Sequence, residues 1–148
     1  MSRTLTFEHR YAADPDRVFA LATDLDTLEA VTRPWVQIHH LPSGPVRPGQ
    51  VIDVGLSLFS LLPVRPYTIR IEACDARARR MRSVEEGAGV RRLVHDLEVR
   101  SDGSGACLID RVEVEAGWMT PLAALFARFI YRWRHHVRQR LLHEGVAS

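Results

Sequence analysis

Apolar and polar side chains alternate along much of the chain, as they do in β-strands that bury one face. Between residues 4 and 11, for example, Leu5, Phe7 and His9 share one side, and the side chains between them share the other. A period of two recurs in six later segments: Trp35–Leu41, Val51–Leu58, Tyr67–Ala73, Met81–Val84, Leu93–Val99 and Leu108–Val114. The pattern therefore predicts a sheet of about seven strands.

The last two of these segments indicate how the sheet is covered. Ser-Asp-Gly-Ser-Gly at residues 101–105 separates them, and this composition is a strong signal for a β-hairpin. Charged side chains occupy one face of both strands, while the opposite face is largely apolar. This pattern is typical of an antiparallel sheet that has one face in water and one face covered.

Two short helices are predicted directly after the first strand. Asp14 is a suitable N-cap, Pro15 suits the first helical position, and a second helix start follows at Asp24. The apolar residues that recur at helical spacing are Val18, Phe19, Leu21, Ala22, Leu25, Leu28 and Val31. Each helix therefore has one apolar side to bury.

A long helix from Pro121 to about His143, capped by Thr120, is predicted to cover the apolar face of the sheet. Its expected core stripe consists of Leu122, Leu125, Phe126, Phe129, Trp133, Val137 and Leu141. Four arginines lie largely off that stripe: Arg128, Arg132, Arg134 and Arg138. They are predicted to form an outer face that is solvated or that contacts acidic lipids.

Composition restricts the classes of function. The 148 residues, 46% of them hydrophobic and 26% charged, fit one domain spanning residues 1–148. A net charge of +2 gives no indication of nucleic-acid binding. Cys74 and Cys107 lie far apart, without the spacing of metal ligands, and the first residues lack the apolar core of a signal peptide. We therefore expect a cytoplasmic protein that needs no metal or cofactor.

Short motifs in this order resemble the START-like (SRPBCC) superfamily, which has the helix-grip fold. Asp-Pro-Asp-Arg-Val-Phe at residues 14–19 resembles the superfamily's small-Pro-acidic-x-Val-aromatic start of the first helix. Thr-Asp-Leu-Asp-Thr-Leu at residues 23–28 resembles its Ser-Asp-x-x-x-Leu motif, and Leu-Ile-Asp-Arg-Val-Glu at residues 108–113 resembles its Leu-x-Asp-x-Val motif. The resemblance implies an α+β domain, with a curved antiparallel sheet, two short helices after the first strand and a long C-terminal helix. Because the superfamily includes lipid carriers, receptors and cyclases, the fold does not choose the function.

Residues 89–97 resemble the aromatic-x-x-Trp-x-His-x-His strand of one bacterial branch of the superfamily. Leu93 stands in place of the Trp and Leu97 in place of the second His, so only His95 is kept. Alternation places His95 and Asp110 on the apolar face of neighbouring strands, opposite each other or nearly so. This pair is a candidate for acid–base catalysis, or the two side chains only satisfy each other inside the sheet.

The candidate ligand-binding residues are those expected to point into the space between sheet and helix: Trp35, Tyr67, Ile69, Leu93, His95, Leu97, Asp110, Phe126, Phe129 and Trp133. Most of them would supply apolar surface, and Tyr67, His95 and Asp110 would orient the ligand. The leading hypothesis is a domain that binds a small hydrophobic or amphipathic molecule, as a carrier or sensor does. The alternative is an enzyme of the polyketide cyclase or dehydratase kind, in which His95, held by Asp110, moves protons.

The connection Phe59–Val64 is too apolar for an ordinary loop. It is predicted to be a lid over the cavity, a contact with a partner or a membrane, or a loop packed beneath the second helix. Exposure of this loop above a collapsed interior would favour an interaction protein. The sequence leaves the identity of the ligand and the oligomeric state open.

Overall fold

Seven antiparallel strands form one sheet in the order β1-β7-β6-β5-β4-β3-β2. The computed structural model describes residues 2–33 and 35–146. Its strands are β1 (Arg3–Tyr11), β2 (Val36–His39), β3 (Val51–Leu58), β4 (Arg65–Asp75), β5 (Arg80–Gly87), β6 (Val90–Asp102) and β7 (Gly105–Glu115). All seven predicted strands are present, so the prediction of the sheet is confirmed.

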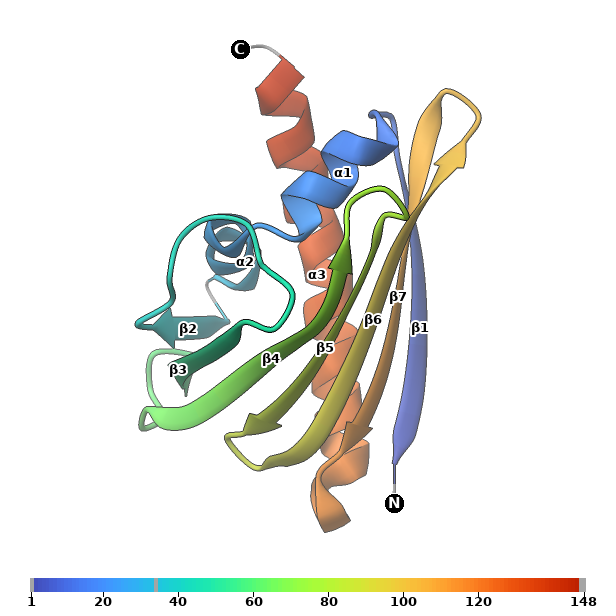
Figure 1. The fold of residues 1–148 in the computed structure, drawn as a ribbon. Coiled ribbons are helices and arrows are strands. Elements are labelled where there is room, and N and C mark those ends of the chain that lie inside the picture. Colours follow the sequence, from blue (N-terminus) through green and yellow to red (C-terminus); the bar gives the residue numbers. More distant parts are fainter. Residues whose placement is uncertain (1, 34, 147–148) are drawn as a thin grey trace.

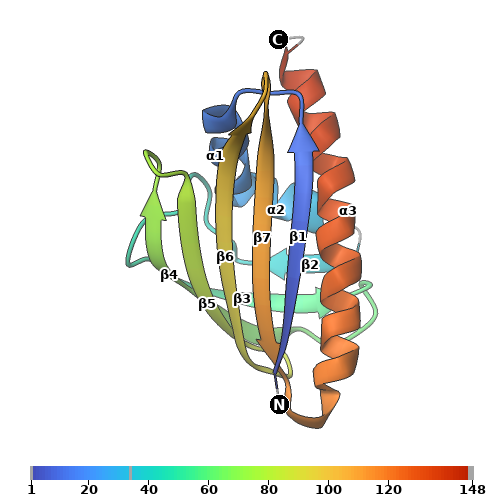
Figure 2. The same ribbon diagram turned by 90° about the vertical axis from the view of Figure 1, so that its right-hand side faces the viewer.

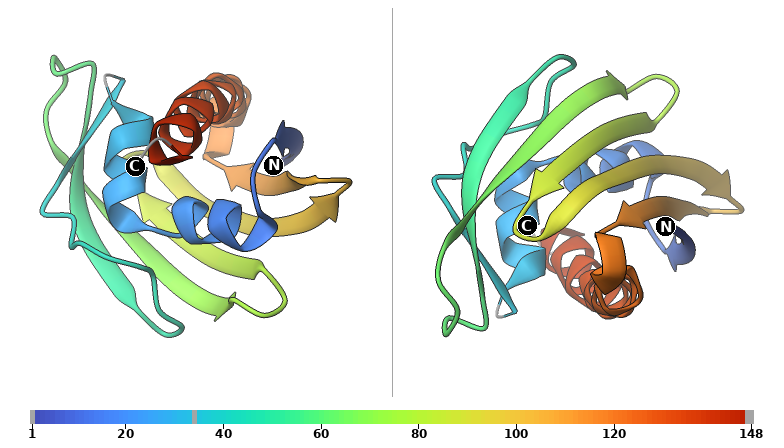
Figure 3. Two further views of the ribbon diagram at one scale, coloured as in Figure 1. Left: turned by 90° about the horizontal axis from the view of Figure 1, so that it is seen from above. Right: turned by 90° about the horizontal axis from the view of Figure 1, so that it is seen from below.

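The sheet curls around three helices, α1 (Pro15–Ala22), α2 (Leu25–Thr32) and α3 (Thr120–Val146) (Figure 1). Figure 2 shows α3 running along almost the full length of the long strands. Seen along its length, the sheet forms an open half-barrel with all three helices on its concave side (Figure 3). Contacts join α3 to β1 and β7, and α1 to β6 and β7. This is the helix-grip arrangement, and the predicted fold is confirmed.

The two short helices begin where their caps predict. The Asp14 carboxylate accepts hydrogen bonds from the backbone N–H groups of Asp16 and Arg17 at 2.8 and 3.4 Å. Asp24 does the same for the first turn of α2, at 2.9 and 3.3 Å. Each cap satisfies N–H groups that have no partner inside the helix.

α3 begins one residue earlier than predicted, because Thr120, the expected cap, is its first helical residue. A short 3₁₀ turn, η1 (Gly117–Met119), precedes the helix, and Thr120 is its first helical residue. The Thr120 hydroxyl donates a hydrogen bond to the carbonyl oxygen of Gly117 and accepts one from the backbone N–H of Ala116. The side chain therefore joins the end of β7 to the first turn of the helix.

The predicted core stripe of α3 is wrong in its first half. Leu122, Leu125 and Phe129 are exposed, with 58%, 62% and 44% of their surface in solvent. The buried residues of this helix include Ala124, Ile130, Tyr131, Val137, Arg138 and Leu142. The helix is thus rotated relative to the prediction, and Arg138 points inward.

Small side chains and a buried charge account for this rotation. Ala124 is buried, and Ala127 packs against the cluster that contains Tyr131, so the helix presents its least bulky residues to the sheet. On the facing strand, Asp110 is fully buried, and Arg138 lies beside it. Because an unpaired charge in the interior is costly, the carboxylate favours the helix orientation that brings Arg138 to it.

Candidate functional site

A band of polar side chains crosses the interior between the sheet and α3. We call His9, His95, Asp110, His135 and Arg138 the polar band. On β1, β6 and β7, each polar-band residue stands between two apolar residues of the same face. One of these belongs to or packs against a cluster around Phe7, Val112 and Tyr131, and the other belongs to the main apolar core. The polar band therefore interrupts an otherwise continuous apolar interior.

His95 and Asp110 form the shortest link in the band. The strands pair Leu97 with Asp110 and His95 with Val112, so the two polar residues are diagonal neighbours on one face. The Nε2 atom of His95 donates a hydrogen bond to Oδ1 of Asp110 over 2.6 Å. The other carboxylate oxygen lies 3.7 Å from Nη1 of Arg138, which is an ion pair too long for a hydrogen bond.

Asp110 is held in its charged form despite complete burial. Burial alone would raise its pKa, but the hydrogen bond from His95 and the charges of His95, Arg138 and Arg134 hold the pKa below its ordinary value. Because Arg138 is itself only 3% exposed, these charges interact with little screening by water. The interior therefore contains a charged carboxylate and a guanidinium, which is rare unless both are paired.

Two histidines stack at the other end of the band. The rings of His9 on β1 and His135 on α3 lie 4.3 Å apart and nearly parallel, and Tyr11 packs against His135. Burial lowers the pKa of His135 to about 4, and the charges of His9, His136 and Arg138 act in the same direction. Burial also lowers the pKa of His9, against the opposing effect of Asp110. Both rings are therefore neutral near pH 7.

This pair should make the protein less stable in mild acid. The pKa of His135 is about 4 in the folded protein and 6.5 in an unfolded chain, so between these values the unfolded chain takes up the proton first. The free energy of unfolding should decline as the pH falls through this range, as measured by urea denaturation. His135→Phe should flatten the decline, since phenylalanine stacks without titrating.

The matched control for this prediction is His40→Asn. His40 is exposed and has φ = 66°, a left-handed conformation that asparagine tolerates. The control should keep the pH dependence of the wild type. An unchanged slope in His135→Phe would show that this ring does not cause the loss of stability.

Two tyrosines border the polar band. Tyr131 on α3 stacks on Phe7 at 5.3 Å and meets the His95 ring edge-on at 5.3 Å, while the guanidinium of Arg134 lies 4.5 Å from the centre of its ring. Tyr67 donates a hydrogen bond to the Glu85 carboxylate at 2.7 Å, and burial, with the nearby charge of Glu85, raises the pKa of Tyr67. Polar groups from β4, β5 and α3 thus extend the band toward the middle of the sheet.

Several buried polar atoms of this region have no hydrogen-bond partner in the part of the chain that the structure describes. They are Nδ1 of His9, the hydroxyl of Tyr11, Oδ2 of Asp110, Nε of Arg134, Nδ1 of His135, and Nε and Nη1 of Arg138. Buried polar atoms in folded proteins nearly always have a partner, which is another protein group, an ordered water or a ligand. The polar band and its neighbours Tyr11 and Arg134 therefore have unused hydrogen-bonding capacity, most of it in donors.

The structure divides the predicted site residues between two places. Tyr67, Ile69, Leu93, His95, Leu97 and Asp110 lie on the concave face of the sheet, in or next to the polar band. Trp35, Phe126, Phe129 and Trp133 lie elsewhere, beside α2 and the first half of α3. There, Trp35 contacts Phe129 and Trp133 at 5.1 and 5.6 Å between ring centres, and Trp133 donates a hydrogen bond to the carbonyl oxygen of Arg33.

Sequence reasoning missed two of the five polar-band residues and several of their neighbours. Arg138 and His135 were assigned no role in the interior, and neither were Tyr131, Arg134 or Glu85. One signal was available for the helix: Ala124, Ala127, Tyr131 and Arg138 recur at spacings of three, four and seven residues. Small residues on one helix face indicate close approach to a neighbour, which would have placed Arg138 inside.

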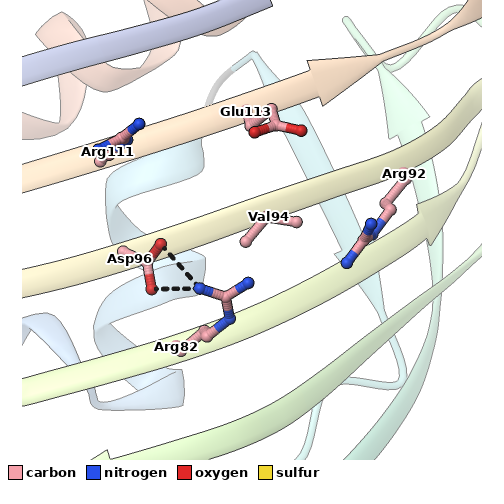
Figure 4. A pocket seen from close by; sticks show the side chains of 6 residues that line it. All are labelled: Arg82, Arg92, Val94, Asp96, Arg111 and Glu113. Carbon is pink, nitrogen blue, oxygen red and sulfur yellow. Dashed lines mark hydrogen bonds and ion pairs between the residues drawn. The ribbon is translucent and has the colours of Figure 1, made fainter. Parts of the chain in front are cut away.

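Two hollows in the surface lie away from the polar band. One is on the outer, convex face of the sheet and is lined by Arg82, Arg92, Val94, Asp96, Arg111 and Glu113 (Figure 4). Asp96 and Arg82 form an ion pair across it at 3.3 Å. The other lies between the two short helices and the end of α3 and is lined by Arg17, Ala20, Leu21, Asp24, Thr27 and Leu142. Neither of these two hollows is lined by a polar-band residue.

Comparison with solved structures shows the same fold in proteins of very different sequence. Ara h 8.0201 superimposes with a TM-score of 0.74 at 13% identity, covering 97% of this chain and 99% of its own. CV1439 from Chromobacterium violaceum gives 0.75 at 15% identity, covering 94% and 96%. TTHA0849 from Thermus thermophilus gives 0.65 at 17% identity, covering 98% and 97%. These likenesses confirm the START-like resemblance at the level of the fold.

Comparison of the sequence with family models identifies a narrower group of proteins than the fold does. A family model described as a domain of unknown function (DUF8410) matches residues 9–142. No match was found among the curated proteins. The matched range includes every residue of the polar band.

Proposed function

Since the chain belongs to the DUF8410 family and has the helix-grip fold, we propose that it binds a small amphipathic molecule between the sheet and α3. The apolar body of this molecule would pack against the concave face of the sheet, beside Ile69 and Leu97. Its polar end would occupy the polar band. The single observation that carries the proposal is the set of buried polar atoms there that have no hydrogen-bond partner among the residues that the structure describes.

The chemistry of these atoms indicates the polar end of the ligand. Arg134 and Arg138 together offer three donor nitrogens that have no hydrogen-bond partner among the described residues, and the Tyr11 hydroxyl, which lies beside Arg138, is one more donor. Asp110 offers one unused acceptor, Oδ2. A ligand that carries oxygen acceptors, above all a carboxylate, would satisfy more of the band than a ligand that carries only donors.

The same geometry supports binding more than acid–base catalysis. A catalytic His95 would need a free ring nitrogen that faces the substrate. Nε2 is bonded to Asp110, which leaves Nδ1 for that role, but the ring packs against Tyr131 and only 7% of the side chain is exposed. We therefore favour a structural and orienting role for this pair.

Native mass spectrometry of the protein purified from its own host tests the proposal. The wild type should carry a bound small molecule, and Arg138→Gln should retain about tenfold less of it, because a hydrogen bond to a charged group contributes about 1.5–3 kcal/mol. Arg140→Gln is the matched control, since Arg140 is exposed on the same helix and should retain the ligand.

A pair of defined probes tests the preference for an acidic end. Octanoate and 1-octanol have the same apolar chain, so calorimetric titration should show tighter binding of octanoate to the wild type. Arg138→Gln should remove this preference and Arg140→Gln should keep it. The proposal is wrong if the purified protein carries no ligand and neither probe distinguishes the wild type from Arg138→Gln.

A further inference from the structure

An apolar surface remains exposed at the open side of the half-barrel. We call Leu61, Leu62 and Val64 of the β3–β4 loop, together with Trp118, Leu122, Leu125 and Phe129, the apolar surface. Leu61 and Trp118 are 85% and 87% exposed, and the others are exposed by at least 44%. Isolated exposed apolar residues are ordinary, but several exposed apolar residues on two neighbouring segments indicate an interaction site.

The two parts of the apolar surface are joined by aromatic contacts. On α3 and the turn before it, Trp118, Leu122, Leu125 and Phe129 follow one another at spacings of four, three and four residues, so they share one helix face. The ring of Phe59, at the start of the loop, meets Phe126 at 6.2 Å. Both views in Figure 3 show this loop and α3 bordering the open side of the half-barrel.

The loop is held in a strained conformation that displays its leucines. Phe59 and Ser60 both have φ = 56°, a left-handed conformation that a bulky aromatic residue rarely adopts. The backbone N–H of Phe59 donates a hydrogen bond to the carbonyl oxygen of Trp35 at 2.9 Å, and that of Ser60 donates to the Gln37 side chain at 2.8 Å. The next residues, Leu61 and Leu62, therefore project from an anchored turn.

The β3–β4 loop with the adjoining parts of its strands, and α3 up to His143 with the turn before it, carry only positive charges. Residues 54–71 and 116–143, which contain the whole apolar surface, include no Asp or Glu. Arg65 follows the loop directly, and Arg128 and Arg132 lie one turn and two turns beyond Leu125 on α3. All three are exposed, and none forms an ion pair with a residue that the structure describes.

From this combination we infer that the apolar surface docks on an anionic lipid bilayer. Leucine, tryptophan and phenylalanine side chains would enter the boundary between headgroups and acyl chains, where tryptophan is favoured. Arg65, Arg128 and Arg132 would remain among the negative headgroups. Within the described residues no helix is long and apolar enough to cross a membrane, so the contact would be peripheral.

Charge favours a bilayer over a second copy of this chain. A symmetric dimer would place the same surface on both sides, and the three arginines of one copy would face those of the other without an acidic partner. An anionic bilayer supplies the opposite charge. Because a bilayer is fluid, it can also accommodate side chains as exposed as those of Leu61 and Trp118. The inference does not depend on the binding of a ligand inside the domain.

Flotation with lipid vesicles tests this inference. The wild-type protein should float with vesicles of phosphatidylcholine and phosphatidylglycerol and should float much less with phosphatidylcholine alone. Leu61→Asp and Trp118→Asp should each weaken partition by about tenfold or more, the factor expected when one large apolar side chain no longer leaves water. Arg132→Gln should weaken partition about fivefold on the anionic vesicles, which corresponds to the ~1 kcal/mol contributed by one cationic side chain.

Two matched variants outside the apolar surface serve as controls. Val51→Asp places the same charge at an exposed valine on β3, and Arg47→Gln removes an exposed arginine from the β2–β3 connection. Both should float as the wild type does, and urea unfolding should show that all variants are folded. The inference is overturned if the wild type does not prefer anionic vesicles, or if Val51→Asp and Leu61→Asp lose binding equally. It is also overturned if the wild type is a dimer that Leu61→Asp dissociates and that binds no vesicles.

Discussion

Replacing Asp110 with alanine is expected to lower the free energy of unfolding by about 3–5 kcal/mol, because removing one partner of a buried ion pair leaves the other charge uncompensated. Asp110 is fully buried, and its loss would remove the acceptor of His95 and the counter-charge of Arg138 together. Urea denaturation at neutral pH measures the effect. Asp110→Asn should cost less, since its amide oxygen still accepts the hydrogen bond from His95.

Asp102→Ala is the control for this prediction. Asp102 forms an ion pair with Arg10 at 2.8 Å, but both side chains are largely exposed, so this variant should cost less than about 1 kcal/mol. The burial and pairing described for Asp110 would be contradicted if both alanine variants were equally stable.

Protonation of Asp110 at low pH should also lower the free energy of unfolding of the wild type. The folded-state pKa of Asp110 lies below its ordinary value of 3.8, so the carboxylate contributes stability above pH 3.8. This contribution is lost as the pH falls through the folded-state pKa. The acid loss due to Asp110 should therefore begin below the range in which His135 acts.

Replacing Tyr131 with alanine is expected to cost about 3–5 kcal/mol, the range for removing a buried aromatic ring. Tyr131 is 5% exposed and packs on Phe7 and His95. Phe129→Ala, two positions away on the same helix, should cost about 1 kcal/mol, because the Phe129 ring is already 44% exposed. Chemical denaturation of both variants measures the difference.

This comparison tests the orientation of α3 directly. The apolar pattern of the sequence predicts Phe129 in the core, whereas the structure places Tyr131 there. If Phe129→Ala were the more destabilising change, the helix would have the orientation that the pattern predicts. Tyr131→Phe should cost less than about 1 kcal/mol and would separate the contribution of the ring from that of the hydroxyl.

The elements of this protein follow from local signals in its sequence. Asp14 and Asp24 cap the two short helices because a carboxylate just before a helix accepts from its first free N–H groups, and this depends only on nearby residues. The alternation of polar and apolar residues predicts which face of β6 and β7 is in water and which is covered. This also depends only on nearby residues, because successive side chains of a strand point to opposite sides. The contact between His95 and Asp110 was predictable because a short hairpin sets the register of the two strands.

The positions of His135 and Arg138 in the polar band depend on how α3 packs against the sheet. Nearly every face of α3 carries apolar or long side chains, so Leu122 and Phe129 competed with Ala124 and Tyr131 for the interior. Burial of Asp110 and the close approach allowed by the alanines resolved this competition in favour of the face that carries Arg138. Local patterns thus determined the strands, the caps and the alternation of faces. The rotation of α3, and with it both the buried charges and the exposed apolar surface, depended on contacts between residues far apart in the chain.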